Sequence, residues 1–426
     1  MADPEPLLIR NALVVTLDAA NTVHQAADVL IENGAITAIG SIEGRRASAA
    51  RRIIDGTGKM LVPGFVNAHT HSPATLIHGT GDRLSHPAHM WMNQAYTANK
   101  TPREIYVSAM LGCIQMLLSG TTAALDHFPG QSCTVEDVDA ALSAYRDSGM
   151  RAVLGVRFYD AEFGDIMPRA GSVPAEVAAE IRRLSPLNPM PLQDVRAVME
   201  GAIARWHGTD GRLAVFPAPS NPERCSDDAL LLCRELAERH GLGIHTHLLE
   251  SRVQADNARR LYGCTMVEHL DRLGLLGPFL SCAHAIWLEP ADIERLAASG
   301  AVVVHNPESN MKIAAGTAPI PALIARGAGR RWRRHQRQPD HARGVAACDH
   351  APSPGPGRAR GLARGERRAH HGDKRRRGWR PTDWAESRPA STPISCSIAW
   401  TRRGGCRSTI HKASSCSPRT VARSTW

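Results

Sequence analysis

Leu61-Val-Pro-Gly-Phe-Val-Asn-Ala-His69-Thr-His71 decides the fold, because an apolar run ends there in two histidines one residue apart. Pro63 lies near its start and Pro73 disfavours a helix directly after it, so the stretch predicts a buried strand that leads into a loop. Residues i and i+2 of a strand point to the same side. His69 and His71 therefore present two imidazoles to one point, as a divalent metal of the zinc type requires. Because the chain has 20 histidines, such a pair also arises by chance, and its surroundings must decide.

Strand-like and helix-like segments alternate from residue 61 to about residue 327. The strands are expected at 61–69, 121–127, 151–157, 212–218, 242–248, 279–285 and 301–306. Amphipathic helices are expected between them, at 101–119, 135–149, 226–240, 253–274 and 289–299. This alternation predicts parallel βαβ units, and strands that end in ionisable residues favour a (β/α)₈ TIM barrel with its site at the carboxyl ends. A doubly wound sheet is the alternative, although no glycine-rich phosphate loop opens a helix.

Residues 7–55 alternate short apolar runs with turn residues and predict a small N-terminal β domain. Asn33-Gly34 between two strand-like runs is a strong hairpin signal. We therefore expect three parts: a small β-sandwich-like domain at 1–58, a barrel at 59–327, and an Arg/Pro/Gly-rich tail at 328–426.

The net charge of +10 belongs entirely to the tail. Residues 1–327 hold 28 basic and 35 acidic side chains, whereas residues 328–426 hold 23 basic and 6 acidic ones. No signal peptide and no apolar stretch of membrane-spanning length is apparent, and the ten cysteines include no CxxC pair. The sequence therefore predicts a cytoplasmic protein with reduced cysteines and no membrane partner, and it leaves a homo-oligomer open.

Later strands end in further residues suited to hydrolytic chemistry. His247 lies at the end of the fifth strand, where a third metal ligand would be needed, and Glu250 follows within reach of a metal-bound water as general acid/base. His245, two residues deeper, is assigned a structural role. His284 ends the sixth strand and would be neutral if buried, so it could take a proton from the water. For each of these histidines a hydrogen-bonded structural role is the alternative.

Five ordered motifs together resemble the amidohydrolase superfamily, in its hydrolytic deaminase and chlorohydrolase branch. The resemblance covers about residues 7–327 and rests on Pro63-Gly-Phe-Val-Asn-Ala-His-Thr-His71, Ser119-Gly-Thr-Thr122, His247-Leu-Leu-Glu250, Ala283-His284, and His305-Asn-Pro-Glu-Ser-Asn310 with Ala318-Pro319. It implies that His69, His71 and His247 bind one metal. It also implies that Glu250 and His284 handle protons.

The resemblance implies hydrolytic deamination of an amino-substituted N-heterocycle by a water that Zn²⁺, or alternatively Fe²⁺, activates. A triazine-type chlorohydrolase or aminohydrolase is the alternative within this class. Substrate contacts are expected from a loop with Trp91 and Gln94, from Asp126-His127 after the second strand, and from His305 and Asn310 in a loop after the seventh strand. In relatives that act on adenosine-type substrates, the loop after the fourth strand resembles Pro-His-Ala-Pro. Here that loop reads Pro219-Ser-Asn-Pro222, so Ser220 replaces the histidine. This difference leaves free bases, pterins or triazines open as substrates.

The resemblance stops near residue 328. The family's eighth strand carries a metal-binding aspartate, but here the pattern gives way to an Arg-rich segment with one leucine, Leu362, and neither Phe nor Tyr. We interpret residues 328–426 as out of frame and disordered, which predicts an incomplete barrel, little turnover and a tendency to aggregate. The non-enzymatic alternative is a catalytically dead product whose basic tail binds nucleic acid or other polyanions non-specifically.

Overall fold

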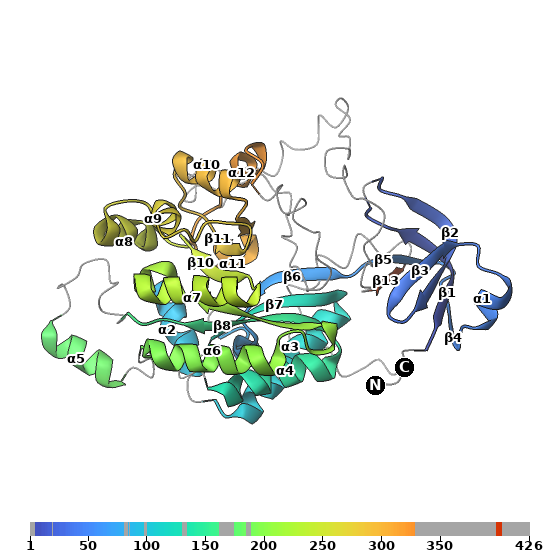
Figure 1. Ribbon diagram of the computed structural model, residues 1–426, viewed down its shortest axis with the longest axis horizontal. Helices are drawn as coiled ribbons and strands as arrows, with labels where there is room; N and C mark the ends of the chain where they lie inside the picture. The colour runs from blue at the N-terminus through green and yellow to red at the C-terminus, as the bar shows by residue number, and fades with distance from the viewer. Residues whose placement is uncertain are drawn as a thin grey trace, which may run out of the picture. The chain divides into compact units, whose positions relative to one another are not determined.

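The structure, a computed structural model, describes residues 5–18, 20–80, 84, 86–97, 100–129, 134–161, 174–184, 189–328 and 398–402 (Figure 1). These residues fall into two compact units. The first contains the described residues within 1–65, 120–122 and 398–402, and the second contains those within 66–119 and 123–328. Each unit is described by itself.

The first unit is a sheet in the strand order β13-β5-β1-β2-β3, with β4 also paired to β1. Its strands are β1 (Leu7–Val15), β2 (Val23–Glu32), β3 (Ala35–Gly40), β4 (Arg52–Asp55), β5 (Lys59–Pro63) and β13 (Ile398–Arg402), and a short helix α1 spans Gly44–Ser48. Strand β2 runs antiparallel to β1 and β3, whereas β4 and β5 run parallel to β1. The predicted hairpin turn is present, with positive φ at both Asn33 and Gly34.

Apolar side chains on both faces of this sheet are buried. Ile9, Val29 and Leu61 belong to one cluster, and Leu8, Leu30 and Ile42 belong to another. Neighbouring residues of a strand point to opposite faces, so each of β1 and β2 contributes to both clusters. The free energy gained by burying these side chains is what fixes the register of the strands.

Strand β13 is a difference from the sequence prediction, which placed no strand after residue 328. Ile398–Arg402 pairs antiparallel with Lys59–Pro63 of β5. This short segment contains Ile398, Trp400 and Thr401, residue types that favour an extended backbone. The rest of the predicted tail lies outside the described residues.

The second unit holds seven strands among its described residues, in two sheets. One sheet has the order β6-β7-β8-β9 and the other β10-β11-β12. The strands are β6 (Phe65–Thr70), β7 (Thr121–Pro129), β8 (Arg151–Phe158), β9 (Leu213–Pro219), β10 (Ile244–Leu248), β11 (Leu280–His284) and β12 (Val302–Val304). Strands β7, β8 and β9 are parallel to one another, as are β10, β11 and β12.

Hydrogen bonds join the two sheets at the carboxyl ends of β9 and β10. The hydroxyl of Thr246 donates to the Pro219 carbonyl at 2.8 Å, and the His247 amide donates to the Ser220 carbonyl at 3.3 Å. The strand order and these bonds are consistent with the predicted barrel. The predicted strand 61–69 is divided at Gly64, between β5 of the first unit and β6 of the second.

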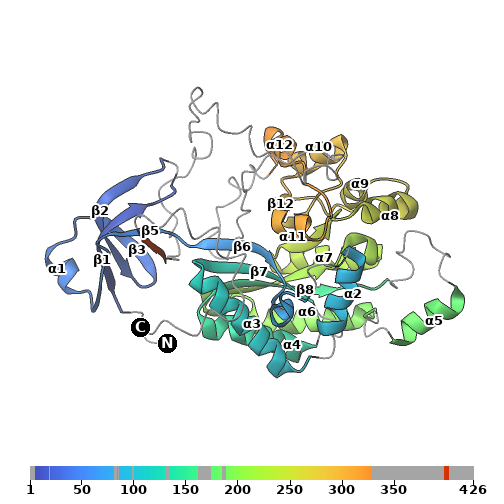
Figure 2. The ribbon, with the colours of Figure 1, turned by 180° about the vertical axis from the view of Figure 1, so that it is seen from behind.

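Helices separate successive strands, as the alternating pattern predicts. They are α2 (His86–Thr97), α3 (Pro102–Leu118), α4 (Val135–Ser148), α5 (Ala175–Leu184), α6 (Leu192–Trp206), α7 (Asp227–His240), α8 (Arg252–Tyr262), α9 (Met266–Arg272), α10 (Pro290–Ser299), α11 (Pro307–Lys312) and α12 (Ile320–Ala325). Short 3₁₀ turns span Ser72–Ile77, Thr209–Gly211 and Pro222–Arg224. Figure 2 shows α3, α4 and α6 along one side of β7 and β8.

Three local predictions are wrong. The expected helix 253–274 is two helices, because Gly263 ends α8 at a φ of 68° and the Thr265 side chain caps the start of α9. The expected loop with Trp91 and Gln94 is helix α2, and the expected loop with Asn310 contains helix α11. Favourable helix starts, such as Pro307 in the first turn of α11, explain why these segments are helical.

The two faces of β8 show how the second unit is packed. Leu154, Val156 and Phe158 belong to the large core that includes side chains of α4 and α6. Val153, on the opposite face, packs against Leu125 of β7 and Ala214 of β9. This second face is the inner face of the predicted barrel. The site described below lies on the same face, nearer the carboxyl ends of the strands.

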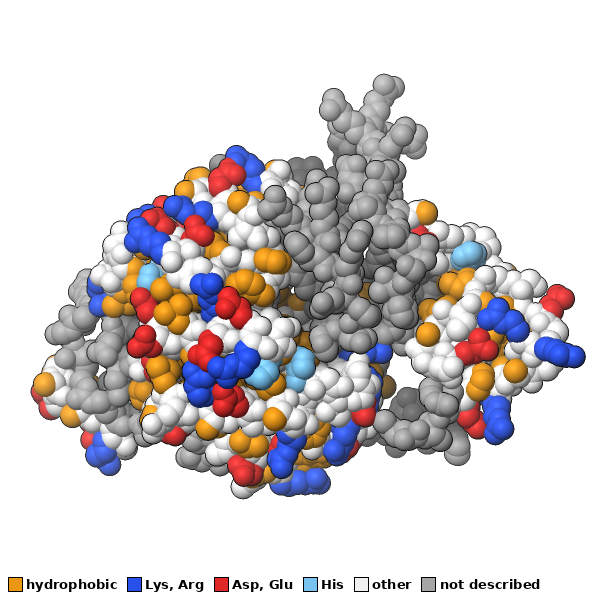
Figure 3. Space-filling view, in the orientation of Figure 1, with side chains coloured by type: hydrophobic (Ala, Val, Ile, Leu, Met, Phe, Trp, Pro, Cys, Tyr) orange, Lys and Arg blue, Asp and Glu red, His pale blue; other side chains and the backbone are white. Residues whose placement is uncertain are grey.

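The described surface of the second unit carries charges of both signs. Figure 3 shows Lys/Arg and Asp/Glu side chains interspersed over it. On α6 and α7, for example, Arg196 Nη2 lies 2.7 Å from Glu235 Oε2 and Arg239 Nη1 lies 3.1 Å from Glu200 Oε1. The five cysteines of the described residues are buried and none forms a disulfide. In the part of the chain that is described, no helix combines the length and apolar character needed to cross a membrane.

Candidate metal centre

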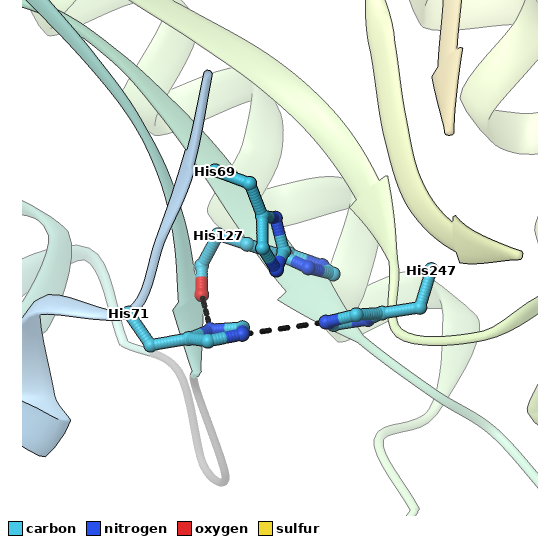
Figure 4. A group of neighbouring side chains, drawn as sticks. All are labelled: His69, His71, His127 and His247. Atoms are coloured by element: carbon cyan, nitrogen blue, oxygen red, sulfur yellow. Dashed lines mark hydrogen bonds between the residues drawn. The ribbon is translucent and has the colours of Figure 1, made fainter. Parts of the chain in front are cut away.

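Four histidines from three strands converge at one point of the second unit. His69 and His71 come from the end of β6, His127 from β7 and His247 from β10 (Figure 4). One ring nitrogen of each lies within 4.8 Å of those of the others. We call these residues the four-histidine cluster. It brings together the three metal ligands that the sequence analysis predicted, and it adds His127.

The hydrogen bonds of His71 and His247 fix which nitrogen of each ring is free. Nδ1 of His71 donates to the His127 carbonyl at 2.7 Å, and Nδ1 of His247 donates to the Ser220 carbonyl at 2.6 Å. A neutral imidazole that donates from Nδ1 carries a lone pair on Nε2. The two Nε2 atoms face each other at 3.3 Å, so two lone pairs point at one another.

That distance is the one a shared metal ion would require. Two nitrogens on one tetrahedral zinc, with bonds of about 2.0–2.1 Å, lie roughly 3.3–3.4 Å apart. Without a cation, two acceptors at this distance repel each other. The separation of 3.3 Å between the Nε2 atoms of His71 and His247 therefore fits a divalent ion.

A chain of three hydrogen bonds orients His69 in the same way. Ser281 Oγ donates to the Ile244 carbonyl at 3.3 Å and accepts from His245 Nδ1 at 2.7 Å. Nε2 of His245 is then an acceptor, and Nδ1 of His69 donates to it at 2.8 Å. Nε2 of His69 is thereby left with a free lone pair. His245 thus has the positioning role typical of the partners of metal-binding histidines.

His127 is the member of the cluster that the sequence analysis placed elsewhere. It was expected after the second strand as part of the substrate pocket, but it lies within β7, two residues beyond the inward-facing Leu125. Its Nδ1 is buried and has no hydrogen-bond partner among the described residues. The period of two along β7 was the signal that could have placed it beside the metal ligands.

Asp126 points to the other face of β7 and does not line the cluster. It accepts from the Ser72 amide at 3.0 Å and from the Tyr145 hydroxyl at 3.1 Å. Burial raises the pKa of this carboxyl to about 6. Asp126 therefore secures the turn that follows His71.

Glu250 and His284 form a pair beside the cluster. Nε2 of His284 lies 3.4 Å from Oε1 of Glu250, and both side chains are buried. Nδ1 of His284 donates to Asn310 Oδ1 at 2.7 Å, which directs Nε2 at the Glu250 carboxyl. The rings of His284 and His247 lie 5.4 Å apart. This arrangement can accept a proton and return it close to the metal position.

The backbone at the ends of β10 and β11 is strained. Leu249, His284 and Ala285 adopt positive φ values of 48°, 74° and 49°. Non-glycine residues in this region each cost on the order of 1–3 kcal/mol and are concentrated at functional sites. The strain holds Glu250 and His284 at the position where they meet.

The remaining predicted site residues occupy varied positions. Ser220 is buried and orients His247 through its carbonyl. Asn310 holds His284, and its Nδ2 is buried without a partner among the described residues. His305 follows directly after β12. The side chains of Trp91 and Gln94 lie outside what the structure describes.

Burial keeps the histidines of the centre neutral. Burial is the largest cause that lowers the pKa of His71 to about 4, and the charge of Arg157 is the next. Burial likewise lowers the pKa of His245 to about 3 and lowers those of His69, His127 and His247 well below their usual range. Neutral imidazoles are the form that binds a metal.

These shifts predict how the stability of the metal-free chain depends on pH. An unfolded histidine titrates near pH 6.5, so a folded-state pKa of about 4 for His71 gives stability that is present above pH 6.5 and lost as the pH falls toward 4. Asp126, whose pKa is raised to about 6, acts in the opposite direction, because its contribution is lost as the pH rises through 6. Five histidines outweigh one aspartate. We expect the unfolding temperature of the chelator-treated chain, followed by circular dichroism, to fall between pH 7 and pH 4; an unchanged or rising temperature would contradict this account.

Comparison with known proteins identifies the family. Residues 60–329 match the amidohydrolase family. The chain belongs to the amidohydrolase family. Among curated relatives of this amidohydrolase, a 5-methylthioadenosine/S-adenosylhomocysteine deaminase from Syntrophobacter fumaroxidans is 35% identical over 325 residues, which cover 75% of this chain and 67% of the relative. A 5′-deoxyadenosine deaminase from Methanosarcina mazei is 33% identical over 335 residues, which cover 77% of this chain and 67% of that protein.

Solved structures share the fold of this amidohydrolase. An adenosine deaminase from Xanthomonas campestris with bound zinc superposes with a TM-score of 0.62 and 26% identity, over 75% of this chain and 66% of that one. An atrazine chlorohydrolase from Arthrobacter aurescens, solved with zinc, gives a TM-score of 0.65 and 22% identity over 75% and 70% of the two chains. The predicted superfamily, its α/β fold and its enzyme class, a hydrolase of carbon–nitrogen bonds other than peptide bonds, are thus confirmed at the level of the family.

Proposed function

We propose that this amidohydrolase hydrolytically deaminates an amino-substituted N-heterocycle with one divalent cation, zinc, held by His69, His71 and His247. The observation that carries the proposal is the pair of Nε2 lone pairs of His71 and His247 that face each other at 3.3 Å. Relatives named as deaminases of adenosine derivatives support the reaction class. Zinc in two structures of the same fold supports the choice of metal.

The chemistry divides between the cation and the side chains around it. A bound cation supplies a water whose pKa is lowered toward neutrality. Glu250 and His284, whose Oε1 and Nε2 are 3.4 Å apart, would hold a proton beside the cation and pass it to the ring nitrogen and the leaving amine of the substrate. Asn310 keeps His284 Nε2 directed at Glu250 by accepting from Nδ1.

His127 lies beside the three proposed ligands. Its ring lies 4.5 Å from that of His247, and its unpartnered Nδ1 is buried among the described residues. The resemblance to the family implies an aspartate of an eighth strand as the remaining ligand, and no such strand is found among residues 5–328 as far as they are described. We infer that His127 supplies part of the metal environment that this aspartate would otherwise provide.

We also propose that the chain leaves the family pattern near residue 328, with a β domain at 1–58, a barrel at 59–327 that stops after its seventh strand, and an out-of-frame tail. The family match ends at residue 329, next to the position where the sequence pattern stops. Strand β6 ends one of the two described sheets and β12 ends the other, at the sides away from the hydrogen bonds that join β9 and β10. An eighth strand would lie between them in a closed barrel.

Ammonia release tests the reaction. The full chain is loaded with zinc and incubated with four classes of compound in turn, with the protein in molar excess. The classes are adenosine-type nucleosides, aminopurine bases, aminopterins and aminotriazines. We expect zinc-dependent ammonia release from at least one class, and we expect Glu250→Gln to reduce it by about 10²-fold or more while zinc content is unchanged.

Glu238→Gln on α7, an exposed carboxylate that pairs with Arg234, is the matched control and should retain the activity. Equal rates for Glu250→Gln and the unaltered chain would remove Glu250 from the mechanism. A rate of ammonia release that does not change when zinc is removed by a chelator would contradict the proposed reaction as a whole.

A further inference from the structure

Arg157 lies on the inner face of the second unit, beside the four-histidine cluster. It is four residues beyond Val153 on β8, so it points to the same face as Val153, which packs against Leu125 and Ala214. Its partner on β9 in the strand register is Ala218, and its partner on β7 is Pro129. Both partners lie at the carboxyl ends of their strands. Arg157 therefore extends from the end of β8 where catalysis takes place in barrels of this kind.

The register places Arg157 one layer above His127. His127 is paired with Gly155, two residues before Arg157, and strand residues two apart are separated by roughly 6–7 Å. Nε2 of His127 also lies 3.4 Å from the carbonyl of Ala218, the register partner of Arg157. The guanidinium is therefore next to the reacting centre, within reach of a heterocycle bound there.

The side chain of Arg157 is buried, and two of its three nitrogens lack a hydrogen-bond partner among the described residues. Only 4% of it is exposed, and its Nε and Nη2 have no hydrogen-bond partner among the described residues. A buried guanidinium without acceptors is costly, because its lost hydration is not replaced. Gly155 and Ala218, the neighbours of Arg157 on the same face, are among the smallest residues, and a Cβ added to Gly155 would lie 3.0 Å from the Ala218 Cβ. Neither neighbour has a side-chain acceptor for Nε or Nη2 of Arg157.

A second buried arginine adds to the positive charge. Arg224, in the turn after β9, is 3% exposed, and its guanidinium carbon lies 3.8 Å from the Tyr159 ring centroid. Burial and then the charge of Arg224 lower the pKa of Arg157 to about 10, so Arg157 remains a cation at neutral pH. The site therefore favours a ligand with electron-rich oxygen on the side that faces β8.

We propose that Arg157 recognises an oxo oxygen on the heterocycle itself, so that the preferred substrate is an oxo-substituted amino heterocycle. The inference rests on the proposed function. A guanidinium presents a fork of donors that pairs with a carbonyl oxygen and an adjacent ring nitrogen. An adenine ring has no oxygen and offers such a fork only ring nitrogens. Ser220 is not needed for this contact, because its carbonyl already accepts from His247 and its hydroxyl already donates to Asn221.

Binding of matched bases tests the proposal. Equilibrium dissociation constants are measured by calorimetry for adenine, 2-oxoadenine and 8-oxoadenine with the zinc-loaded full chain. We expect at least one oxo base to bind about tenfold or more tightly than adenine, as a charge-assisted hydrogen bond allows. Arg157→Met should abolish that preference, and Arg157→Lys, which keeps the charge without the fork, should retain only part of it.

Arg151→Met is the matched control. Arg151 lies on the same face at the other end of β8, where its Nη1 donates to the Gly211 carbonyl at 3.1 Å, and its loss should leave the preference intact. Equal affinities for all three bases, or a preference that survives in Arg157→Met, would overturn the role of Arg157 and leave the proposed function standing. Absence of binding for every base would also overturn the role of Arg157, whereas the proposed function stands or falls with zinc-dependent ammonia release. Zinc content measured on each variant separates loss of the metal from loss of the contact.

Discussion

His247→Ala is expected to weaken zinc binding by roughly 10²–10³-fold, because it removes one of three imidazole ligands. Structural zinc sites contribute about 10–16 kcal/mol in total, so one ligand accounts for a few kcal/mol. His247, the proposed ligand from β10, also connects the two described sheets through its bond to the Ser220 carbonyl after β9. Competition with a chromogenic chelator measures the affinity.

His240→Ala is the control for this experiment. His240 is an exposed histidine at the end of α7, outside the four-histidine cluster, and its removal should leave the zinc affinity unchanged. Equal losses in both variants would point to a general defect in folding. An unchanged affinity in His247→Ala would exclude it as a ligand.

Restoring the reading frame near codon 328 is expected to raise turnover by at least about a hundredfold and to raise the unfolding temperature. A residue that holds and activates the nucleophilic water contributes on the order of 10²–10⁴ in rate. An eighth strand would also pair with the outer edges of β6 and β12, which are the end strands of the two described sheets. Ammonia release and thermal unfolding are compared between the present chain and the chain with residues 328–426 replaced by those of the shifted frame.

A flexible Gly/Ser segment of the same length in place of residues 328–426 is the control for this comparison. It removes the present tail without adding a strand or an aspartate, so it should leave turnover low. If the frame-restored chain is no more active than this control, the interpretation of residues 328–426 as out of frame is contradicted. High turnover by the present chain would show that His127, or another residue of this chain, already suffices.

The order of strands in the second unit could be predicted because each strand is an apolar run bounded by turn residues. Strand β8, for example, was expected at 151–157 and spans Arg151–Phe158. The break of the expected helix at Gly263 was missed because tertiary contacts decide whether a glycine ends a helix or lies within it. Strand β13 was missed because its pairing with β5 joins residues more than 300 positions apart, which a local pattern cannot indicate.

The candidate site was predicted where sequence spacing alone sets geometry. His69 and His71, two residues apart on one strand, had to share a side. The contribution of His127 depends on the register between β6 and β7, and the role of Asn310 as the acceptor for His284 depends on where α11 lies. The period of two along β7 indicates which face His127 is on, but its distance to the other three histidines and the position of Asn310 are consequences of packing between elements.

X-ray absorption spectroscopy at the zinc edge, on the full chain loaded with one equivalent of zinc, tests the central claim most directly. The expected spectrum shows nitrogen and oxygen atoms at about 2.0–2.1 Å from zinc, together with the outer-shell scattering of at least three imidazoles. His71→Ala and His247→Ala should each remove one imidazole from that pattern. A shell dominated by sulfur at about 2.3 Å, or a spectrum with fewer than two imidazoles, would contradict it.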